Sequence, residues 1–344
     1  MNKLLYIAAA LALLAGCTQK EPADAVSIAV FVPGVTSGNA VYQMLADGVQ
    51  AAAQEHSAQT PDAPVQVSVI EAGTNQAEWS GRLTAVAASG EYDVIISSNP
   101  SMPDIAVPLT QQFPEQKFIL LDAYCEDNGN IFTVRYNQRE QAYLTGYMAG
   151  LVTTASHEQM PYANEAKTVG LIAAQEYPVM NDIILPSFIE GLRAVDSGIT
   201  VDFRIVGNWY DATKAAELAR SMHQNGADVI LPIAGGAAQG VIAAAQEESF
   251  YITWFDDNGF AKAPGYIISS TVMHQDKMAQ EAAAQFLAGN TPFGSAQTVG
   301  IEQGYIDFIT DDPLYESTVN SAIRQAMQQE LDRITSGELQ LPSP

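Results

Sequence analysis

Basic residues are scarce in this sequence. Across 344 residues, 15 Lys and Arg stand against 39 Asp and Glu, which gives a formal net charge of −24 at pH 7. A surface that follows nucleic-acid phosphates needs clustered cations, so nucleic acid is not an expected partner. Hydrophobic residues make up 47% of the chain, which is enough for packed cores. At about 150 residues per domain, the length predicts two folded domains.

Histidine and the motifs of common enzymes are also scarce. The histidines show no metal-ligand spacing, so we expect no metal site and no cofactor; they are His56, His157, His223 and His274. Neither a Gly-x-Ser-x-Gly elbow nor a phosphate loop with Lys occurs in the sequence. We therefore expect a binding protein rather than an enzyme. A hydrolase built on a pair of Asp carboxylates is the alternative.

The apolar run near the N-terminus, residues 4–14, is too short to span a bilayer comfortably. Lys3 precedes it and the sequence Leu-Ala-Gly-Cys, ending at Cys17, follows it, which is the order of parts in an export signal. This tetrapeptide resembles the bacterial lipobox, whose Cys receives a diacylglycerol before the signal is removed. The resemblance implies a lipoprotein signal at residues 1–16, lipidation of Cys17 and a tether over residues 17–25.

The expected location is therefore the bacterial cell envelope, with the chain held by its lipid on the periplasmic or extracellular face of a membrane. If Cys17 carries the lipid, Cys125 has no partner for an internal disulfide. An ordinary cleaved signal with a chance Cys is the alternative.

The chain repeats itself at an offset of about 134 residues. An apolar strand runs into a Gly turn at Gly73 and again at Gly207. The strand ending FILLD, at Asp122, corresponds to the strand ending ITWFD, at Asp256. Each half reads as buried strands alternating with helices, the pattern of a doubly wound parallel sheet.

The fold class predicted is therefore α/β, with two doubly wound Rossmann-like lobes. Further strands at 131–134 and 266–269 lead into helices at 138–154 and 274–288, and we expect each helix to pack on the opposite lobe. The chain then crosses between lobes near residues 135, 272 and 300, and a closing helix spans Ser317 to Ile334. We expect a three-crossing hinge that opens and closes a cleft. The predicted division is 26–134 plus 272–300 for lobe 1 and 135–271 plus 301–336 for lobe 2.

Ligands of parallel sheets bind beyond the carboxyl ends of the strands, where Asp122 and Asp256 lie. A carboxylate there can accept hydrogen bonds from the vicinal hydroxyls of a sugar. The alternative is that each Asp only caps the loop that follows it. The symmetric placement favours a pair facing one cleft.

Other candidate ligand-binding residues cluster near the same strand ends. Trp209, in a loop, is a candidate platform for a planar ligand, whereas Trp254, within a strand, is expected in the core. Asn39 and Tyr42 follow the first strand, although Tyr42 could equally lie on the buried face of its helix. Two further candidates, Gly235 and Gly236, let backbone approach a ligand, with plain turn chemistry as the alternative.

Four runs of the sequence resemble the basic membrane protein family. They are IFTVRYNQREQAYLTGYMAGL (131–151), FIEGLRA (188–194), VGNWYD (206–211) and GADVILPIAGGAAQGVIAAA (226–245). Members are lipoprotein substrate-binding components of nucleoside ABC transporters with the type I periplasmic-binding-protein fold. The resemblance implies a purine held between aromatic rings, with Trp209 as the ring of lobe 2. It also implies a ribose held by Asp256, Asp122 as the acid of lobe 1, and a permease and ATPase as partners. We expect a monomer.

The sequence departs from the family pattern at three places. SGNAVY, residues 37–42, stands where the family has an acidic residue and then Ser-Phe-Asn. Met273 and His274 stand where it commonly has a Lys, and its second acid is shifted to Asp257, next to Asn258. A sugar receptor, a signalling lipoprotein of the same fold and a nucleoside hydrolase are the alternatives to a nucleoside-binding protein.

Overall fold

The computed structural model of the protein describes residues 25–343. The predicted signal peptide, Cys17 and all of the predicted tether except Ala25 lie outside the described residues. Within residues 25–343, none of the helices combines the length and apolar character needed to cross a membrane.

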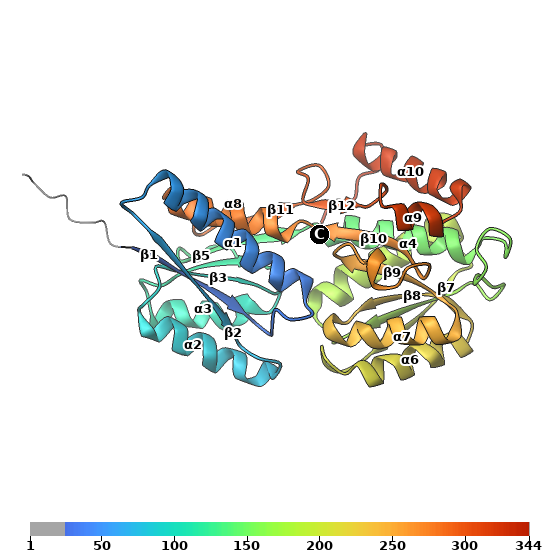
Figure 1. Cartoon of the computed structure of the whole chain (residues 1–344), viewed down its shortest axis with the longest axis horizontal. Coiled ribbons are helices and arrows are strands. Elements are labelled where there is room, and N and C mark those ends of the chain that lie inside the picture. Colours follow the sequence, from blue (N-terminus) through green and yellow to red (C-terminus); the bar gives the residue numbers. More distant parts are fainter. Residues whose placement is uncertain (1–24, 344) are drawn as a thin grey trace, which may run out of the picture.

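Two six-stranded sheets form the centres of two lobes (Figure 1). The sheet of lobe 1 has the order β11 (Ala296–Val299), β5 (Ile131–Tyr136), β4 (Lys117–Leu121), β3 (Val94–Ser98), β1 (Val26–Val32), β2 (Val65–Glu71). The sheet of lobe 2 has the order β12 (Ile306–Phe308), β10 (Ile267–Met273), β9 (Tyr251–Asp256), β8 (Ala227–Ile233), β6 (Thr168–Ala173), β7 (Thr200–Ile205). Neighbouring strands run parallel, apart from β12, which is antiparallel to β10.

Helices cover both faces of each sheet (Figure 1). In lobe 1 these are α1 (Ala40–Gln59), α2 (Trp79–Ser89), α3 (Met102–Gln112) and α8 (Gln275–Leu287), with a short turn η1 (Gln76–Glu78) before α2. In lobe 2 they are α4 (Gln138–Thr153), α5 (Leu185–Val195), α6 (Ala212–Gln224), α7 (Ala238–Glu248), α9 (Pro313–Thr318) and α10 (Ser321–Thr335). Short turns η2 (Met180–Ile184), η3 (Gly235–Ala237) and η4 (Phe260–Lys262) complete lobe 2.

Strand β1 shows why the strands are continuous runs of apolar residues in the sequence. Ile28 and Val30 join the core beneath α1 and α8, whereas Ala29 and Phe31 join the core beneath α2 and α3. Successive side chains of a strand point to opposite faces, so a strand covered on both sides must be apolar at every position.

The two sheets repeat one strand order, with β1 to β5 corresponding to β6 to β10. Gly73 and Gly207 both adopt left-handed backbone, with φ of 75° and 102°, at the turn after the second strand of their lobe. The predicted fold class of two doubly wound α/β lobes is confirmed.

The chain passes between the sheets after β5, after β10 and after β11, and hydrogen bonds tie these crossings together. The Asn137 amide donates to the carbonyl of Val299 at 2.7 Å, and the His274 amide donates to the carbonyl of Tyr305 at 3.0 Å. Glu140, in the first turn of α4, accepts from the Ile301 amide at 2.9 Å. The hinge is thus a bundle of adjacent segments, not separate linkers.

Close helix pairs that depend on a glycine occur in both lobes. A Cβ on Gly48 of α1 would lie 2.2 Å from the carbonyl oxygen of Asp276 in α8, and a Cβ on Gly191 of α5 would lie 2.1 Å from that of Tyr143 in α4. These helices can touch backbone to backbone only because no side chain intervenes. They dock α8 on lobe 1 and α4 on lobe 2.

The prediction of one closing helix from Ser317 to Ile334 is wrong. Helix α9 ends at Thr318 and α10 begins at Ser321. Asn320 between them caps α10, because its side chain accepts a hydrogen bond from the Ala322 amide at 2.9 Å. An Asn cap starts a new helix and requires non-helical backbone at its own position.

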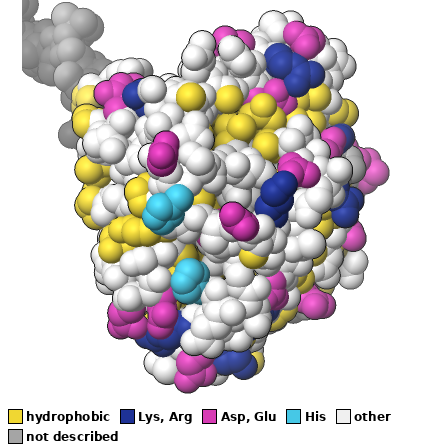
Figure 2. All heavy atoms as spheres, turned by 90° about the vertical axis from the view of Figure 1, so that its right-hand side faces the viewer, with side chains coloured by type: hydrophobic (Ala, Val, Ile, Leu, Met, Phe, Trp, Pro, Cys, Tyr) yellow, Lys and Arg dark blue, Asp and Glu magenta, His cyan; other side chains and the backbone are white. Residues whose placement is uncertain are grey.

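The acidic surface of the chain is not a single block on the outer end of lobe 2. Figure 2 shows Asp and Glu there interspersed with Lys and Arg. Ion pairs in this lobe include Lys167 with Asp196 and Arg220 with Glu247, each at 2.6 Å. Exposed pairs of this kind contribute at most about 1 kcal/mol each, so this surface contributes more to solubility than to stability.

Candidate functional site

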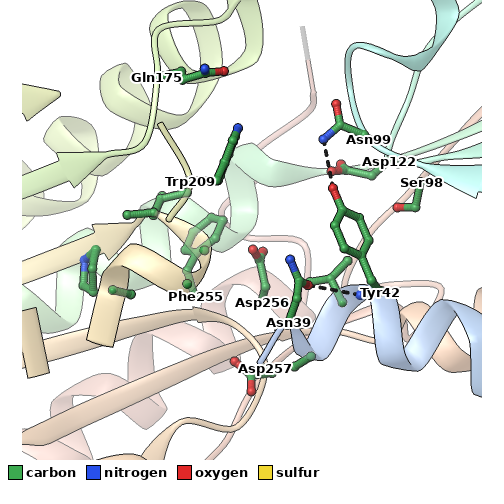
Figure 3. Close-up of a pocket in the computed structure, with 18 of the residues that line it drawn as sticks. Asn39, Tyr42, Ser98, Asn99, Asp122, Gln175, Trp209, Phe255, Asp256 and Asp257 are labelled. Atoms are coloured by element: carbon green, nitrogen blue, oxygen red, sulfur yellow. Dashed lines mark hydrogen bonds between the residues drawn. The ribbon is translucent and has the colours of Figure 1, made fainter. Parts of the chain in front are cut away.

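A cavity lies between the lobes where the carboxyl ends of the parallel strands meet (Figure 3). Segments that follow β1, β3 and β4 line it from lobe 1, and segments that follow β6, β7, β8 and β9 line it from lobe 2. All the ligand-binding residues predicted from the sequence line this cavity: Asn39, Tyr42, Asp122, Trp209, Gly235, Gly236 and Asp256.

Asp122 directly follows β4 and is turned towards the cavity by left-handed backbone, with φ of 50°. Asp tolerates this conformation better than most residues. The side-chain amide of Gln138 donates to its Oδ1 at 2.8 Å. Burial raises the pKa of Asp122 well above its usual range, and the negative charge of Asp256 raises it further.

Asp256, the last residue of β9, has the same backbone conformation, with φ of 77°. The amide of Gln141 donates to its Oδ1 at 3.1 Å. Burial raises the pKa of Asp256 to about 7; the hydrogen bond from Gln141 opposes this shift, and the charge of Asp257 adds to it. Because only one oxygen of each Asp is engaged by a Gln, the other can accept hydrogen bonds from a ligand.

Trp209 lies in the loop after β7 with its ring at the cavity (Figure 3). Its ring centroid is 6.2 Å from that of Tyr177, with the planes tilted by 41°. Gly235 packs against it: a Cβ there would lie 3.3 Å from Cε3 of Trp209, and the φ of 55° disfavours other residues. Gly235 therefore supports the indole in addition to lining the cavity.

Tyr42 lies on the other side of the cavity from Trp209 (Figure 3). It is buried, with 8% of its surface exposed, yet its hydroxyl accepts a hydrogen bond at 3.3 Å from the side chain of Asn99 at the end of β3. The two readings of Tyr42 are thus compatible, because the ring packs in the core of lobe 1 and also lines the cavity. Asn39 caps α1 through its Oδ1, which accepts from the Tyr42 amide at 3.1 Å. Its Nδ2 is the group left to meet a ligand.

Lobe 2 touches lobe 1 through Tyr210, the neighbour of Trp209. A Cβ on Gly34, in the loop after β1, would lie 2.7 Å from the Tyr210 hydroxyl and 2.9 Å from the Tyr42 ring. The lobes therefore meet at the rim of the cavity with no space for a methyl group.

The cavity carries more negative than positive charge. Among the described residues that line it, Lys262 is the one Lys or Arg, facing Asp122, Asp256 and Asp257. Lys262 pairs with Asp257 at 3.0 Å, and the indole N–H of Trp254 donates to the same carboxylate. As predicted, Trp254 is buried, at 8% exposure, although one face of it reaches the cavity. Within residues 25–343, no group of three or more His, Cys, Asp or Glu side chains is placed to hold a metal ion.

Sequence reasoning missed several polar residues of the site. Ser98 ends β3, Asn99 follows it, and Gln175 follows β6, so the strand-end rule that found Asp122 could have found them as well. Gln138 and Gln141 come instead from the start of a helix. Their i, i+3 spacing places them on one helical face, but the sequence does not indicate that this face meets both carboxylates.

The fold and the cavity together define a two-lobed solute-binding protein of the periplasmic-binding-protein class. The chain belongs to the family of PnrA-like ABC transporter substrate-binding proteins, whose model matches residues 25–340. The family consists of substrate-binding proteins of ABC transporters and not of enzymes.

The curated relatives have low sequence identity to this chain, but the matches cover most of each chain. A CD4+ T-cell-stimulating antigen of Listeria monocytogenes is 21% identical over 78% of this chain and 75% of its own. The ABC transporter nucleoside-binding protein BmpA of Lactococcus lactis is 22% identical over 73% and 72%. Among solved structures, an ABC transporter solute-binding protein of Aeropyrum pernix superposes with a TM-score of 0.78 at 19% identity, covering 93% of this chain and 94% of its own.

Proposed function

We propose that this protein binds an unphosphorylated purine nucleoside between its lobes and delivers it to an ABC permease and its ATPase. The observation that carries the proposal is a pair of strand-end carboxylates, Asp122 and Asp256, that face one cavity from opposite lobes. Substrate-binding proteins of ABC transporters work with such a permease and ATPase, so those partners follow from the family.

The arrangement suits the two halves of a nucleoside. Carboxylates that accept from vicinal hydroxyls bind the ribose, and charge-assisted bonds of this kind are among the stronger ones. The indole of Trp209 and the ring of Tyr42 flank the space for a planar base, which stacking stabilises. The name of the Lactococcus lactis relative supports the same ligand class.

The charge of the cavity supports a ligand without phosphate. Its single Lys or Arg among the described residues, Lys262, is already paired with Asp257. A phosphate would meet Asp122 and Asp256 without a free cation to compensate it, and like charges at close range repel strongly in a partly desolvated site.

The proposed cellular setting follows from residues outside the described part. Cys17 is the proposed lipid attachment site, residues 17–25 are the proposed tether, and the bacterial cell envelope is the proposed location. The proposed solution state is a monomer. Labelling with a radioactive fatty acid tests the anchor: Cys17→Ala should abolish incorporation, and incorporation that persists would contradict it.

Calorimetric titration of the purified protein tests the ligand. Guanosine, adenosine and inosine should bind, whereas ribose and guanosine monophosphate should bind at least about tenfold more weakly, since each lacks a contact or adds a repulsion. Absence of binding to every nucleoside would overturn the proposal. Binding of free sugars alone would favour a sugar receptor, and conversion of the nucleoside to base and ribose would identify a hydrolase. If nucleosides bind but deletion of the gene leaves nucleoside uptake unchanged, the protein is a signalling receptor.

A further inference from the structure

The two carboxylates of the cavity are held by one helix. Gln138 and Gln141, in the first turn of α4, each direct a side-chain amide nitrogen to one Asp: Gln138 to Asp122 at 2.8 Å and Gln141 to Asp256 at 3.1 Å. Residues three apart lie on the same face of a helix, so one face of α4 meets both carboxylates. Gln138 itself lines the cavity, whereas Gln141 lies behind Asp256 and is fully buried.

Helix α4 belongs to lobe 2, although it starts directly after the chain leaves lobe 1. It packs on α5, β9 and β10, and the backbones of α4 and α5 meet at Gly191, where a Cβ would lie 2.1 Å from the Tyr143 carbonyl oxygen. Asp256 is in the same lobe as α4, whereas Asp122 follows β4 in lobe 1. The bond from Gln138 therefore joins the two lobes, and the bond from Gln141 stays inside lobe 2.

Both side-chain amides are buried, and each keeps one atom without a hydrogen-bond partner among the described residues. Gln138 is 6% exposed and Gln141 is fully buried, and the Oε1 atoms of both have no hydrogen-bond partner among the described residues. An unpaired buried amide oxygen lowers stability, so each amide is held at a cost to the fold. In each case the amide group keeps its N–H on a carboxylate that faces the cavity.

We propose that Gln138 is an interlobe positioning residue: its bond to Asp122 forms as the lobes close, so engagement of Asp122 and closure of the hinge are linked through α4. Gln141 holds Asp256 in both the open and the closed arrangement. The part that concerns ligand rests on the proposed nucleoside-binding function, whereas the part that concerns closure does not.

The link between Gln138 and closure can be tested because few other titratable side chains interact electrostatically with Asp122. The titratable side chains whose charges interact with it are Asp256 from β9, Tyr42 from α1, Tyr136 from β5 and Tyr177 from the loop after β6. Burial raises the pKa of each of these tyrosines, so they stay neutral across the range in which carboxylates titrate. Removing the donor on Asp122 should therefore raise its pKa further, because a hydrogen bond to the charged form favours that form.

The experiment compares Gln138→Met with the matched variant Gln141→Met, which removes the same amide one helical turn away. Dyes at exposed Ser80 of α2 and Glu217 of α6 report the separation of the lobes by single-molecule energy transfer, in a Cys125→Ser background. Without ligand, Gln138→Met should lower the closing equilibrium constant about tenfold, the loss expected for a hydrogen bond to a charged group. Gln141→Met should leave it within about twofold.

Three further measurements separate positioning from general damage. Thermal unfolding should show both variants folded. Carboxyl ¹³C titration should show a raised pKa of Asp122 in Gln138→Met only. In an Asp122→Leu background, Gln138→Met should no longer change closure, because its partner is gone.

Guanosine is the probe for the ligand-dependent arm, where Gln138→Met should weaken binding about tenfold. If guanosine fails to bind the unmodified protein, the proposed function fails, while the closure arm still tests Gln138. Equal effects of both Met variants on closure, or no effect of Gln138→Met, would overturn the proposal.

Discussion

Lobe 1 and lobe 2 are built on one strand order, and each has an Asp in left-handed backbone at the carboxyl end of its fourth strand. They differ in what surrounds that Asp. Asp256 is held from its own lobe and lies beside a second acid, Asp257, that forms an ion pair with Lys262. Asp122 is held from the opposite lobe by Gln138. The strand-end backbone that points a carboxylate into the cleft is thus the same in both lobes. The side chain that holds the carboxylate comes from the same lobe for Asp256 and from the opposite lobe for Asp122.

This difference in support gives the two carboxylates different roles in binding. A carboxylate held within its own lobe is ready for a ligand whether the cleft is open or closed, which suits the first contact. A carboxylate held across the hinge gains its full set of contacts only on closure, which suits the second. Symmetric strand ends therefore need not have symmetric roles, and the following experiments test where the symmetry ends.

The largest effect is expected from removing both acids. Asp256→Ala and Asp122→Ala should each weaken guanosine binding by at least about an order of magnitude, since hydrogen bonds to charged groups contribute about 1.5–3 kcal/mol. The double variant should bind too weakly to measure by calorimetry. Asp47→Ala, an exposed acid of α1, is the control and should leave binding unchanged. Unaltered affinity of Asp256→Ala would refute its role in holding the ribose.

The aromatic residues should show a smaller and unequal effect. Trp209→Ala should weaken guanosine binding about tenfold or more, because stacking of a base on an aromatic ring contributes about 1–3 kcal/mol. Tyr42→Phe keeps the ring and removes only the bond from Asn99, so a loss of about threefold is expected. Calorimetry distinguishes the two, and Trp209→Ala should reduce the response of the tryptophan fluorescence to guanosine, with the remainder coming from Trp79 and Trp254 at the cavity. Equal losses in both variants would mean that the indole is not the platform.

The glycine contacts test whether the lobes tolerate overpacking alike. Gly48→Ala and Gly191→Ala each place a methyl carbon closer to a backbone carbonyl oxygen than van der Waals contact allows, at 2.2 Å and 2.1 Å. Each should destabilise the protein by about 1–3 kcal/mol in chemical denaturation. Gly81→Ala, with open space around its Cβ, is the control and should not be destabilising. A neutral Gly191→Ala would show that α4 is not fixed to lobe 2, which would also weaken the assignment of Gln138.

The pH dependence should show opposite trends for stability and affinity between about pH 5 and 8. The pKa of Asp256 is raised to about 7 in the folded state, above its value in the unfolded chain. Its contribution to the free energy of unfolding is therefore greatest at low pH and is lost as the pH rises through 7. Binding of ribose hydroxyls needs the carboxylate, so guanosine affinity should fall as the pH drops below 7. Melting and calorimetric curves measured in the same buffers check this, and parallel trends would contradict it.

The strand ends were predictable because parallel sheets place them in one region. FILLD and ITWFD identify the end of a buried strand by composition alone, and geometry then brings Asp122 and Asp256 to the cleft. The same reasoning located Trp209 and the Gly235–Gly236 turn. Two local signals were readable but not used: the Asn39 cap of α1, and Asn320, which divides the closing helix.

Gln138 and Gln141 could not be predicted in the same way. Their positions on α4 are readable from the helical period, but their partners depend on how the helix enters lobe 2 after the crossing at Asn137. That path is set by tertiary contacts, such as the approach of Gly191 to Tyr143. Local sequence specifies which face a helix presents, and only the packed hinge decides which carboxylates it meets.

The contact between Tyr210 and Gly34 has a kinetic consequence. Because the tyrosine hydroxyl fills the space beside a glycine at the rim, separation of the lobes widens the path by which a bound solute leaves the cavity. The opening rate of the hinge then limits how fast a bound solute is released, in addition to the strength of the contacts inside the cavity. A carrier that must wait for a vacant permease gains from such retention, because it can hold its cargo for long periods while binding it only moderately tightly.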